Sequence, residues 1–468
     1  MHAQPILRNA ICAVTALAYG CTDPGDELAS TSDSQQLQLQ LQGRRLFETA
    51  LPGTNGRSCA TCHVLGEHSA LSVENVEARF AANPHDPLFH PLDADDPTAA
   101  QPTFDHLRKG LVRVVLPLPP NMDVIDLAGH VVTPADRKIA VWRGVPTIEN
   151  TAPTGPYQLD GRAANLSVQA QSAITAHSQG PIVAGHKLDQ IAAFERDQFS
   201  SPRARFVAKL LELGVPRDQI PIPERAMHLS AQERRGRDVY ELACAPCHGG
   251  PTTNQIVNRP VRNALFFALK PDGNIIYDVA PGQPPAPRLA PHTGEFLNIG
   301  IGLLSGYGQM GLIPMSNDTV ELPRYRFRFY TDGTRSQRVT DLPPIPVTAS
   351  GDPNDLTPAL DERGAPIVGP SQGVQWFSTD PGRAAITGDP LDFEAFDVPQ
   401  LRGIARTAPY FHDNNSSTLQ QVVDLYSRFM LQFPPLNLPP VHPPEIPGFP
   451  ESLSVQEKQD LIAFLNRL

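Results

Sequence analysis

The chain has 468 residues, of which 40% are hydrophobic, and its net charge is −11. This length fits two or three domains with ordinary cores, and the negative charge argues against a nucleic-acid partner. Downstream of the N-terminal segment, no apolar stretch approaches membrane-spanning length. Fifty prolines and 34 glycines predict long loops between the regular elements.

The first residues are typical of an export signal. Arg8 supplies a positive start, and residues 10–19 form a short apolar run. Two processing sites are consistent with this segment. Residues 16–18, Ala-Leu-Ala, form an ordinary small-x-small site, whereas residues 18–21 resemble a lipobox that would leave Cys21 as a lipidated first residue.

The N-terminal half is predicted to contain helices on either side of a loop-rich stretch. Residues 64–140 show no clean helical period, so we expect an irregular insertion there with two short strands. Good helix formers precede it, and the chain becomes helical again after it. The expected elements are a helix at 37–48, strands at 111–116 and 139–142, and helices at 163–175 and 188–213.

The C-terminal half is predicted to begin after the proline-bounded linker at residues 216–223. Capping boxes at Ser230 and Ser454 predict one helix at the start of this half and another at its end. Between them, residues 255–375 form a second long interruption. Within it, arginines alternate with aromatic residues over 324–330, which predicts an edge strand with one solvated face.

Two Cys-x-x-Cys-His motifs are the most specific feature of the sequence. Two thiols at this spacing can bond to both vinyl groups of one haem, and the adjacent imidazole can then bind the iron. The other two cysteines lie in the N-terminal segment, so two haems account for every cysteine in the body of the protein. The expected attachment residues are Cys59, Cys62 and His63, and Cys244, Cys247 and His248.

Zinc sites and redox disulfides are the alternatives for a Cys-x-x-Cys pair. A zinc site built from both pairs would leave the two adjacent histidines unexplained. A redox pair is expected with a thioredoxin-like βαβ pattern, which this sequence lacks. The motifs therefore predict two covalently bound c-type haems.

The predicted fold is mainly α, with two cytochrome c-like haem domains, long loop-rich insertions and a few short strands. A helix before the haem motif and a closing helix are what a small cytochrome c domain needs. The expected divisions are a signal peptide at 1–21, a flexible tether at 22–36, an N-terminal haem domain at 37–220 with insertion 64–140, and a C-terminal haem domain at 221–468 with insertion 255–375.

Three short segments resemble the bacterial di-haem cytochrome c peroxidase and MauG superfamily. They are residues 160–163 (Asp-Gly-Arg-Ala), 396–402 and 407–413, and the two motifs fall in the order of that family. The resemblance leaves both insertions uncovered. It implies a peroxide-reacting N-terminal haem with His63 as proximal ligand, and an electron-transferring C-terminal haem bound by His248.

The resemblance also implies a second protein ligand for the C-terminal haem. Some members use methionine there and MauG-like members use tyrosine; here Tyr426 stands at that position, with Met430 one turn further on. A phenolate favours ferric iron, whereas a thioether raises the haem potential. The alternative is that Tyr426 is a core residue, because it shares an apolar helix face with Val422 and Val423.

The open side of the N-terminal haem departs from the family pattern. Members carry a glutamine, a proline four residues later, and a glutamate ten residues after the glutamine, which moves the peroxide proton. The matching residues here are Gln169, Ala173 and Gln179, and a glutamine cannot carry a proton at neutral pH. His177 could replace the glutamate as proton relay, could bind the iron as a distal ligand, or could lie on the surface.

Two further departures concern the contact between the haems. Members place a tryptophan there, but this chain has Leu159. Tyr157 or Trp142 could replace it as a site for electron hopping, or electrons could tunnel directly between the haems. Members also often bind calcium through an asparagine and two backbone carbonyls. The carbonyl positions are Thr407 and Pro409, and the asparagine position is a glycine, so the resemblance implies calcium only weakly.

Together these features predict a di-haem c-type oxidoreductase that reacts with hydrogen peroxide at the N-terminal haem and draws electrons through the C-terminal haem. The expected donor is a small cytochrome, a cupredoxin or a protein substrate. The alternative is a non-catalytic di-haem electron carrier, which Gln179 and Leu159 favour and Tyr426 opposes. We expect the protein in the periplasm, with a lipid anchor at Cys21 left open.

Overall fold

The fold is described from a computed structural model of the chain. Within the part of the chain that it describes, the fold is mainly helical with a few short strands, as the sequence predicts. None of the helices in this part is both long and apolar enough to span a bilayer. The predicted signal peptide and Cys21 lie outside the described residues. These are 26–126, 128–257, 296–301, 320–343, 377–432, 438, 440–446 and 449–468.

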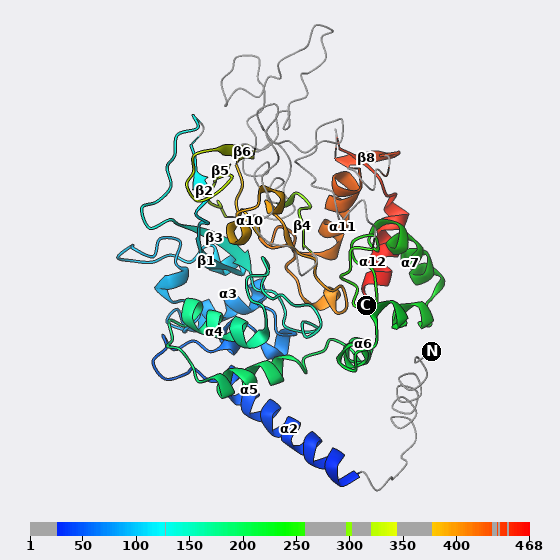
Figure 1. The fold of residues 1–468 in the computed structure, drawn as a ribbon. Helices are drawn as coiled ribbons and strands as arrows, with labels where there is room; N and C mark the ends of the chain where they lie inside the picture. Colours follow the sequence, from blue (N-terminus) through cyan, green and yellow to red (C-terminus); the bar gives the residue numbers. More distant parts are fainter. Residues whose placement is uncertain are drawn as a thin grey trace, which may run out of the picture.

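Two groups of helices lie on opposite sides of the molecule (Figure 1). The first group comes from the N-terminal half and the second from the C-terminal half. The first contains α2 (Asp26–Glu48), α4 (Leu166–His177) and α5 (Gly185–Glu195). The second contains α7 (Ala231–Ala243), α11 (Leu419–Arg428) and α12 (Val455–Leu465). The other described helices are α3 (Val73–Ala82), α6 (Pro202–Glu212) and α10 (Ala384–Thr387).

In each group, one pair of helices crosses at a glycine. α2 packs on α5 at Gly43, where an added Cβ would lie 1.9 Å from the backbone oxygen of Gln190. α7 packs on α12 at Gly236, where an added Cβ would lie 1.8 Å from the backbone oxygen of Asp460. Only glycine allows two helix backbones to approach this closely.

The aromatic residues beside the two crossings also correspond. One turn beyond Gly43, the ring of Phe47 lies 5.0 Å from that of Phe194. One turn beyond Gly236, the ring of Tyr240 lies 5.3 Å from that of Phe464. The two helix pairs therefore share one local construction, although they come from different halves of the chain.

A second correspondence is an internal repeat that the sequence analysis does not predict. Residues 145–177 align with residues 398–430 without a gap, and both segments begin with Val-Pro and continue to a Thr-x-Pro-Tyr sequence. In both, the peptide bond before the proline of Thr-x-Pro-Tyr is cis, and an isolated antiparallel bridge starts at the tyrosine. The segments then start α4 and α11, with Asn165 and Thr418 as the N-cap residues.

The two insertions meet in one small sheet. β2 (Met122–Val124), from the first insertion, pairs antiparallel with β5 (Phe327–Tyr330), from the second, and β5 also pairs with β6 (Arg338–Leu342). β5 is therefore a central strand, and the prediction of an edge strand over 324–330 is wrong. The local pattern could not show this, because the strand that covers one edge of β5 lies in a distant part of the sequence.

The strands predicted within the first insertion are confirmed. β1 (Leu111–Pro117) and β3 (Lys138–Gly144) pair antiparallel. Their inward residues join those of the three-stranded sheet in one apolar cluster. The remaining strands are two short pairs, β4 (Phe296–Leu297) with β7 (Phe396–Asp397), and β8 (His442–Ile446) with β9 (Phe449–Glu451).

Helix boundaries are correct where local capping sets them and wrong elsewhere. Both predicted capping boxes form, at Ser230 and Ser454. The single helix predicted over 188–213 is instead α5 and α6, which Ser201 separates by capping α6 ahead of its first-turn proline. α2 begins at Asp26, within the predicted tether 22–36 and directly after Pro24 and Gly25, and no proline or glycine interrupts residues 26–36.

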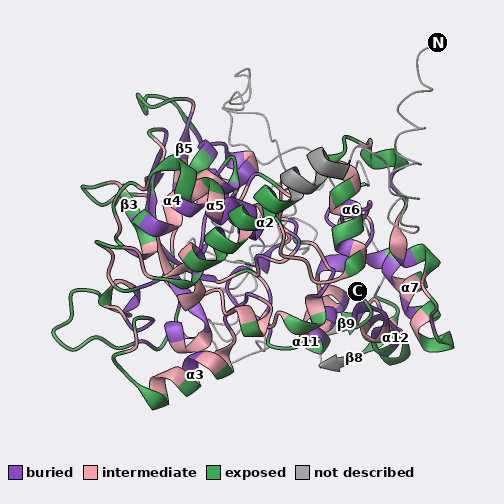
Figure 2. Cartoon of the chain, turned by 90° about the horizontal axis from the view of Figure 1, so that it is seen from below, coloured by how far each residue is buried: buried purple, intermediate pink, exposed green. Residues whose placement is uncertain are grey.

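Burial follows this architecture. Figure 2 shows exposed residues on the outward faces of α2, α6 and α7, and buried residues in the interior between the helix groups and the strands. Each helix thus turns one face to the protein and one to solvent, as an amphipathic helix of a globular protein does.

The crossing of α7 and α12 provides a test of the fold. We expect Gly236→Ala to destabilise the protein by about 3 kcal/mol, because the new methyl group cannot coexist with the Asp460 carbonyl oxygen. Urea unfolding of the full chain, followed by circular dichroism, measures this change. Gly66→Ala is the control, since no atom lies within 4 Å of its added Cβ, and it should change stability by less than about 0.5 kcal/mol. Equal stabilities of the two variants would contradict the described crossing.

Candidate functional site

The first Cys-x-x-Cys-His motif forms a tight turn after α2. Its residues Cys59–Thr61 make a short 3-10 helix, and the backbone N–H of His63 donates to the carbonyl of Cys59 over 2.9 Å. Both cysteines are free thiols. Burial raises the pKa of Cys59 to about 12 and that of Cys62 to about 11, so both stay protonated at neutral pH.

The two motif histidines are oriented in the same way. The Nδ1 atom of His63 lies 3.2 Å from the carbonyl oxygen of Ser69, and that of His248 lies 3.1 Å from the carbonyl oxygen of Pro399. The carbonyl of Pro146, which aligns with Pro399 in the repeat, also hydrogen-bonds His63. An Nδ1–H bonded to a carbonyl leaves Nε2 unprotonated, which is the state that binds a metal.

Burial keeps both imidazoles neutral. It lowers the pKa of His63 and lowers that of His248 to about 4. Each motif therefore presents two thiols and one metal-binding nitrogen. These residues fit a c-type haem. The two thiols of each motif would attach the haem, and the histidine that follows them would bind its iron through Nε2.

A cavity of about 320 Å³ adjoins the first motif, at the lower end of the range for ligand pockets. Cys59, Cys62 and His63 line one part of it. One face of α4 lines another part through Gln169, Ala173 and His177, which are spaced one turn apart. The structure thus brings the first motif together with two of the three residues predicted for the open side.

His177 lines this cavity, whereas Gln179 does not. α4 ends at His177, and the chain then turns through a positive φ of 52° at Gln179, whose exposed side chain accepts a long hydrogen bond of 3.4 Å from Asn55. Gln179 is therefore misplaced as a predicted residue of the distal pocket. Ala173 explains the difference, because a proline at this position would interrupt the helix before it reached His177.

The surroundings of His177 favour its neutral form. Burial lowers its pKa, Arg57 and Arg162 lower it further, and Asp93 acts in the opposite direction. A neutral imidazole in a cavity can accept a proton or bind a metal. His177 is half-buried and faces the cavity, and its role as proton relay or distal ligand stays a prediction.

Three residues of the cavity wall are absent from the sequence predictions. Asp93 comes from the first insertion and forms a fully buried ion pair with Arg57. Glu195 ends α5, and only 4% of its surface is exposed. No motif marks these residues, since the fold brings them to the cavity from separate elements. The sequence alone gives no signal for these residues, because their burial depends on the fold.

The structure also distinguishes between the two residues proposed for electron hopping. Tyr157 and Leu159 line the cavity. Trp142 does not, and instead stacks on His106 with ring centres 4.1 Å apart. Of the two aromatic candidates, only Tyr157 therefore adjoins the first motif.

At the second motif, α11 carries Tyr426, which aligns with Ala173 of α4 in the repeat. Burial raises the pKa of its phenol, and the thiols of Cys247 and Cys244 raise it further. Tyr426 and Cys244 pack against the same apolar cluster. Its ring faces that of Phe411 with centres 6.4 Å apart. Without a cation beside it the phenol stays protonated, so ligation of a metal cation would supply the charge that ionises it.

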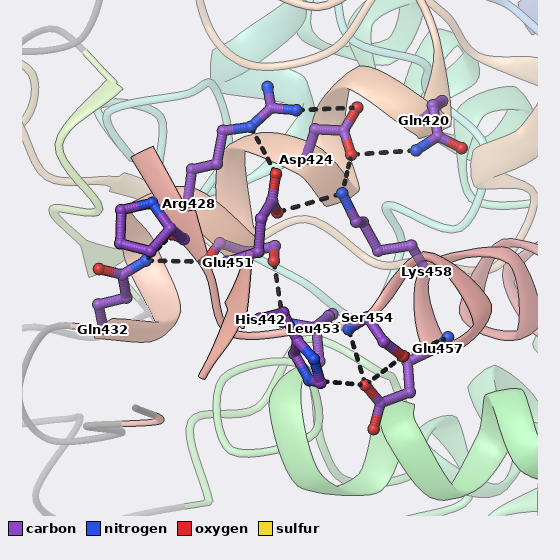
Figure 3. Close-up of polar contacts among 12 residues, drawn as sticks. Gln420, Asp424, Arg428, Gln432, His442, Glu451, Leu453, Ser454, Glu457 and Lys458 are labelled. Carbon is purple, nitrogen blue, oxygen red and sulfur yellow. Dashed lines mark hydrogen bonds and ion pairs between the residues drawn. The ribbon is translucent and has the colours of Figure 1, made fainter. Parts of the chain in front are cut away.

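A buried ion network fixes the helix that carries Tyr426 (Figure 3). The Lys458 ammonium, on α12, lies 2.9 Å from Asp424 Oδ1 and 3.1 Å from Glu451 Oε2. Arg428 donates to Glu451 over 2.8 Å. Asp424 and Arg428 stand on either side of Tyr426 in α11, so the network sets the position of the helix against α12.

The asparagine position of the predicted calcium site is Gly144 in this chain, and another side chain fills the space there. Asn414 Oδ1 lies 2.2 Å from the point that a Cβ on Gly144 would occupy, so the Asn414 side chain fills the space of a side chain at 144. Its Nδ2 donates to the carbonyl of Lys109 over 3.0 Å. Calcium at the carbonyls of Thr407 and Pro409 stays a prediction.

Comparison with known proteins supports the resemblance seen in the sequence. No protein-family model matches the chain. Over 90 residues it is 40% identical to cytochrome-c peroxidase IdrP2 of Denitromonas iodatirespirans, which covers 19% of this chain and 21% of that protein. Over 50 residues it is 46% identical to cytochrome c551 peroxidase of Nitrosomonas europaea, which covers 11% and 15%. The matches thus span about a fifth or less of these relatives, and they confirm the resemblance to bacterial cytochrome c peroxidases.

Solved structures give a weaker likeness. A MauG-like protein associated with microbial copper homeostasis is 17% identical with a TM-score of 0.39, over 92% of this chain and 88% of that one. The diheme peroxidase BthA from Burkholderia thailandensis is 16% identical with a TM-score of 0.37, over 92% and 85%. Scores this low carry no argument about function.

The Lys458 network can be tested by removing its cation. We expect Lys458→Met to lower the free energy of unfolding by about 3 kcal/mol, because the buried Glu451 carboxylate and the half-buried Asp424 carboxylate lose their common partner. Urea unfolding measures the change. Lys209→Met, at the exposed pair with Glu212, is the control and should cost less than about 0.5 kcal/mol. Equal free energies of unfolding for the two variants would show that the network does not stabilise the fold.

Proposed function

We propose that the protein is a di-haem c-type oxidoreductase that reacts with hydrogen peroxide at the N-terminal motif and receives electrons through the C-terminal motif. The donor would be a small cytochrome, a cupredoxin or a protein substrate. The cytochrome c peroxidases that the chain matches support this reaction class. A c-type haem bound at each motif would supply the iron redox chemistry.

The observation that carries the proposal is a difference between the two repeated segments. Ala173 in α4 aligns with Tyr426 in α11. At the first site this position holds only a methyl group, and a cavity adjoins the motif histidine. At the second site the same helical position holds a phenol close to the thiol pair. One site is therefore built to admit a small substrate, and the other to supply a protein ligand.

The residues of the cavity can handle the proton that peroxide chemistry requires. A neutral His177 can accept a proton from bound peroxide and return it to the departing oxygen. Gln169, on the same helix face, can donate a hydrogen bond into the cavity. His63 orients its Nε2 toward the site through its bond to the Ser69 carbonyl.

We also infer two cytochrome c-like haem domains, at residues 37–220 and 221–468, with insertions at 64–140 and 255–375. The matching glycine crossings at Gly43 and Gly236 support this division, since each half has its own helix pair behind a motif. Covalent haem attachment and the N-terminal segment place the protein in the periplasm under this proposal. A lipid anchor at Cys21 is an alternative to ordinary signal cleavage.

The role of His177 can be tested with the full chain produced in a host that matures c-type cytochromes. If His177 relays the proton, His177→Ala should slow the peroxide reaction of the ferric protein by about 100-fold, as measured by stopped-flow absorption. If it is instead a resting ligand, the resting spectrum should change and the reaction should accelerate. His186→Ala is the control, because His186 is exposed on α5. No peroxide reaction in the wild type would support the electron-carrier alternative.

The ligand at the second site can be tested by Tyr426→Phe. We expect a changed spectrum of the C-terminal haem and a higher reduction potential, because an anionic oxygen ligand that favours ferric iron is lost. Magnetic and absorption spectra with a redox titration measure both. Tyr410→Phe is the control, since its hydroxyl donates to the Ile404 carbonyl. Spectra of Tyr426→Phe identical to those of the wild type would refute ligation.

A further inference from the structure

The Glu195 carboxyl is enclosed in the wall of the N-terminal cavity and lacks a partner. It is the last residue of α5, with 4% of its surface exposed, and it lines the cavity together with Cys59 and Tyr157. Its Oε2 atom is buried and accepts no hydrogen bond. A buried carboxyl in this state is costly, and such groups usually have a function.

The charged and titratable groups that face Glu195 are few. Cys59, from the motif, and Tyr157, from the loop before α4, both interact with it electrostatically. Arg196 follows it in the chain and is its only cationic influence. The same cavity wall carries His177 of α4 and the charged residues Arg57, Asp93, Arg113, Arg143 and Arg162. None of these is among the groups that shift the pKa of Glu195. Glu195 forms no ion pair with any described residue.

These surroundings favour the protonated carboxyl. Burial raises the pKa of Glu195 to about 8, against a smaller opposing effect of Arg196. The C-terminal end of α5 adds negative potential, which also disfavours a carboxylate. Because the pKa is raised, the proton is held below about pH 8 and lost as the pH increases through that value.

We propose that Glu195 is the redox-linked proton group of the N-terminal cavity. It binds a proton from solvent when the cofactor there gains an electron, and it releases the proton when the electron leaves. One electron and one proton then move together, so the charge of the enclosed cavity stays constant. This inference rests on the proposed haem at the first motif, but it does not depend on reaction with peroxide.

The coupling follows from the low dielectric of the site. A positive cofactor close to Glu195 favours the carboxylate, and a neutral one favours the acid. Between the two resulting pKa values, the reduction potential should fall by up to about 59 mV for each tenfold decrease in proton concentration. A surface carboxylate would be screened and would show a much weaker dependence.

The experiment is a set of equilibrium redox titrations of the N-terminal haem, in the full-length holoprotein, between about pH 6 and pH 9. We expect the wild-type potential to fall with pH and the Glu195→Gln potential to be flat, because an amide of the same size cannot titrate. Glu212→Gln, at an exposed position of α6, should keep the wild-type slope. An unchanged slope in Glu195→Gln would overturn the proposal.

A second measurement covers the case in which Glu195→Gln does not fold. The infrared difference spectrum between reduced and oxidised wild type should contain a protonated-carboxyl band that shifts in D₂O. Glu394 is the other described glutamate whose pKa burial raises to about 8, so Glu394→Gln shows whether the band is its own. Absence of any such band, or its loss in Glu394→Gln, would overturn the proposal. Absence of covalent haem would instead reject the proposed function.

Discussion

Arg143, which is buried between the two halves of the chain, fixes the position of one site relative to the other. Its guanidinium donates to Asp160, in the N-terminal half, over 2.6 Å, and to Asp380, in the C-terminal half, over 2.6 and 2.9 Å. The next residue, Gly144, donates its backbone N–H to the carbonyl of His412 over 2.7 Å. Arg143 and Gly144 also line the N-terminal cavity. A buried arginine cannot lose either carboxylate cheaply, so the wall of one site is fixed to the frame of the other.

The parts of the fold that depend on local sequence could be predicted, and those that depend on distant contacts could not. Capping at Ser230 and Ser454 set the helix starts, and the strand predicted at 111–116 is present as β1. β5 appeared to be an edge strand because its partner β2 belongs to another insertion. The repeat of residues 145–177 was missed for a different reason: its few shared positions, mainly prolines, become persuasive only when the turns and caps are seen to coincide.

The candidate sites show the same division. The two motifs were visible because attachment chemistry requires a fixed local spacing. Of the predicted distal residues, Gln169 and His177 line the cavity and Gln179 does not. A ten-residue spacing implies a position only if the helix between has the expected form. Ala173 carries the backbone N–H that a proline lacks, so α4 continues to His177 and Gln179 falls outside the cavity. Glu195 belongs to no motif, and only packing reveals it.

The repeat also shows how one scaffold can give two sites with different access. A backbone carbonyl orients the histidine at each motif, that of Ser69 at the first and that of Pro399 at the second, and a helix with the same start in the repeat follows in each half. With these features held constant, the side chain at one helical position separates the sites: the Ala173 methyl group leaves room, and the Tyr426 phenol occupies it. The surrounding charges then differ accordingly. If a cofactor is bound at each motif as proposed, the first site would need a group that takes up or releases a proton when the cofactor changes oxidation state, whereas an ionised Tyr426 would supply the compensating charge at the second.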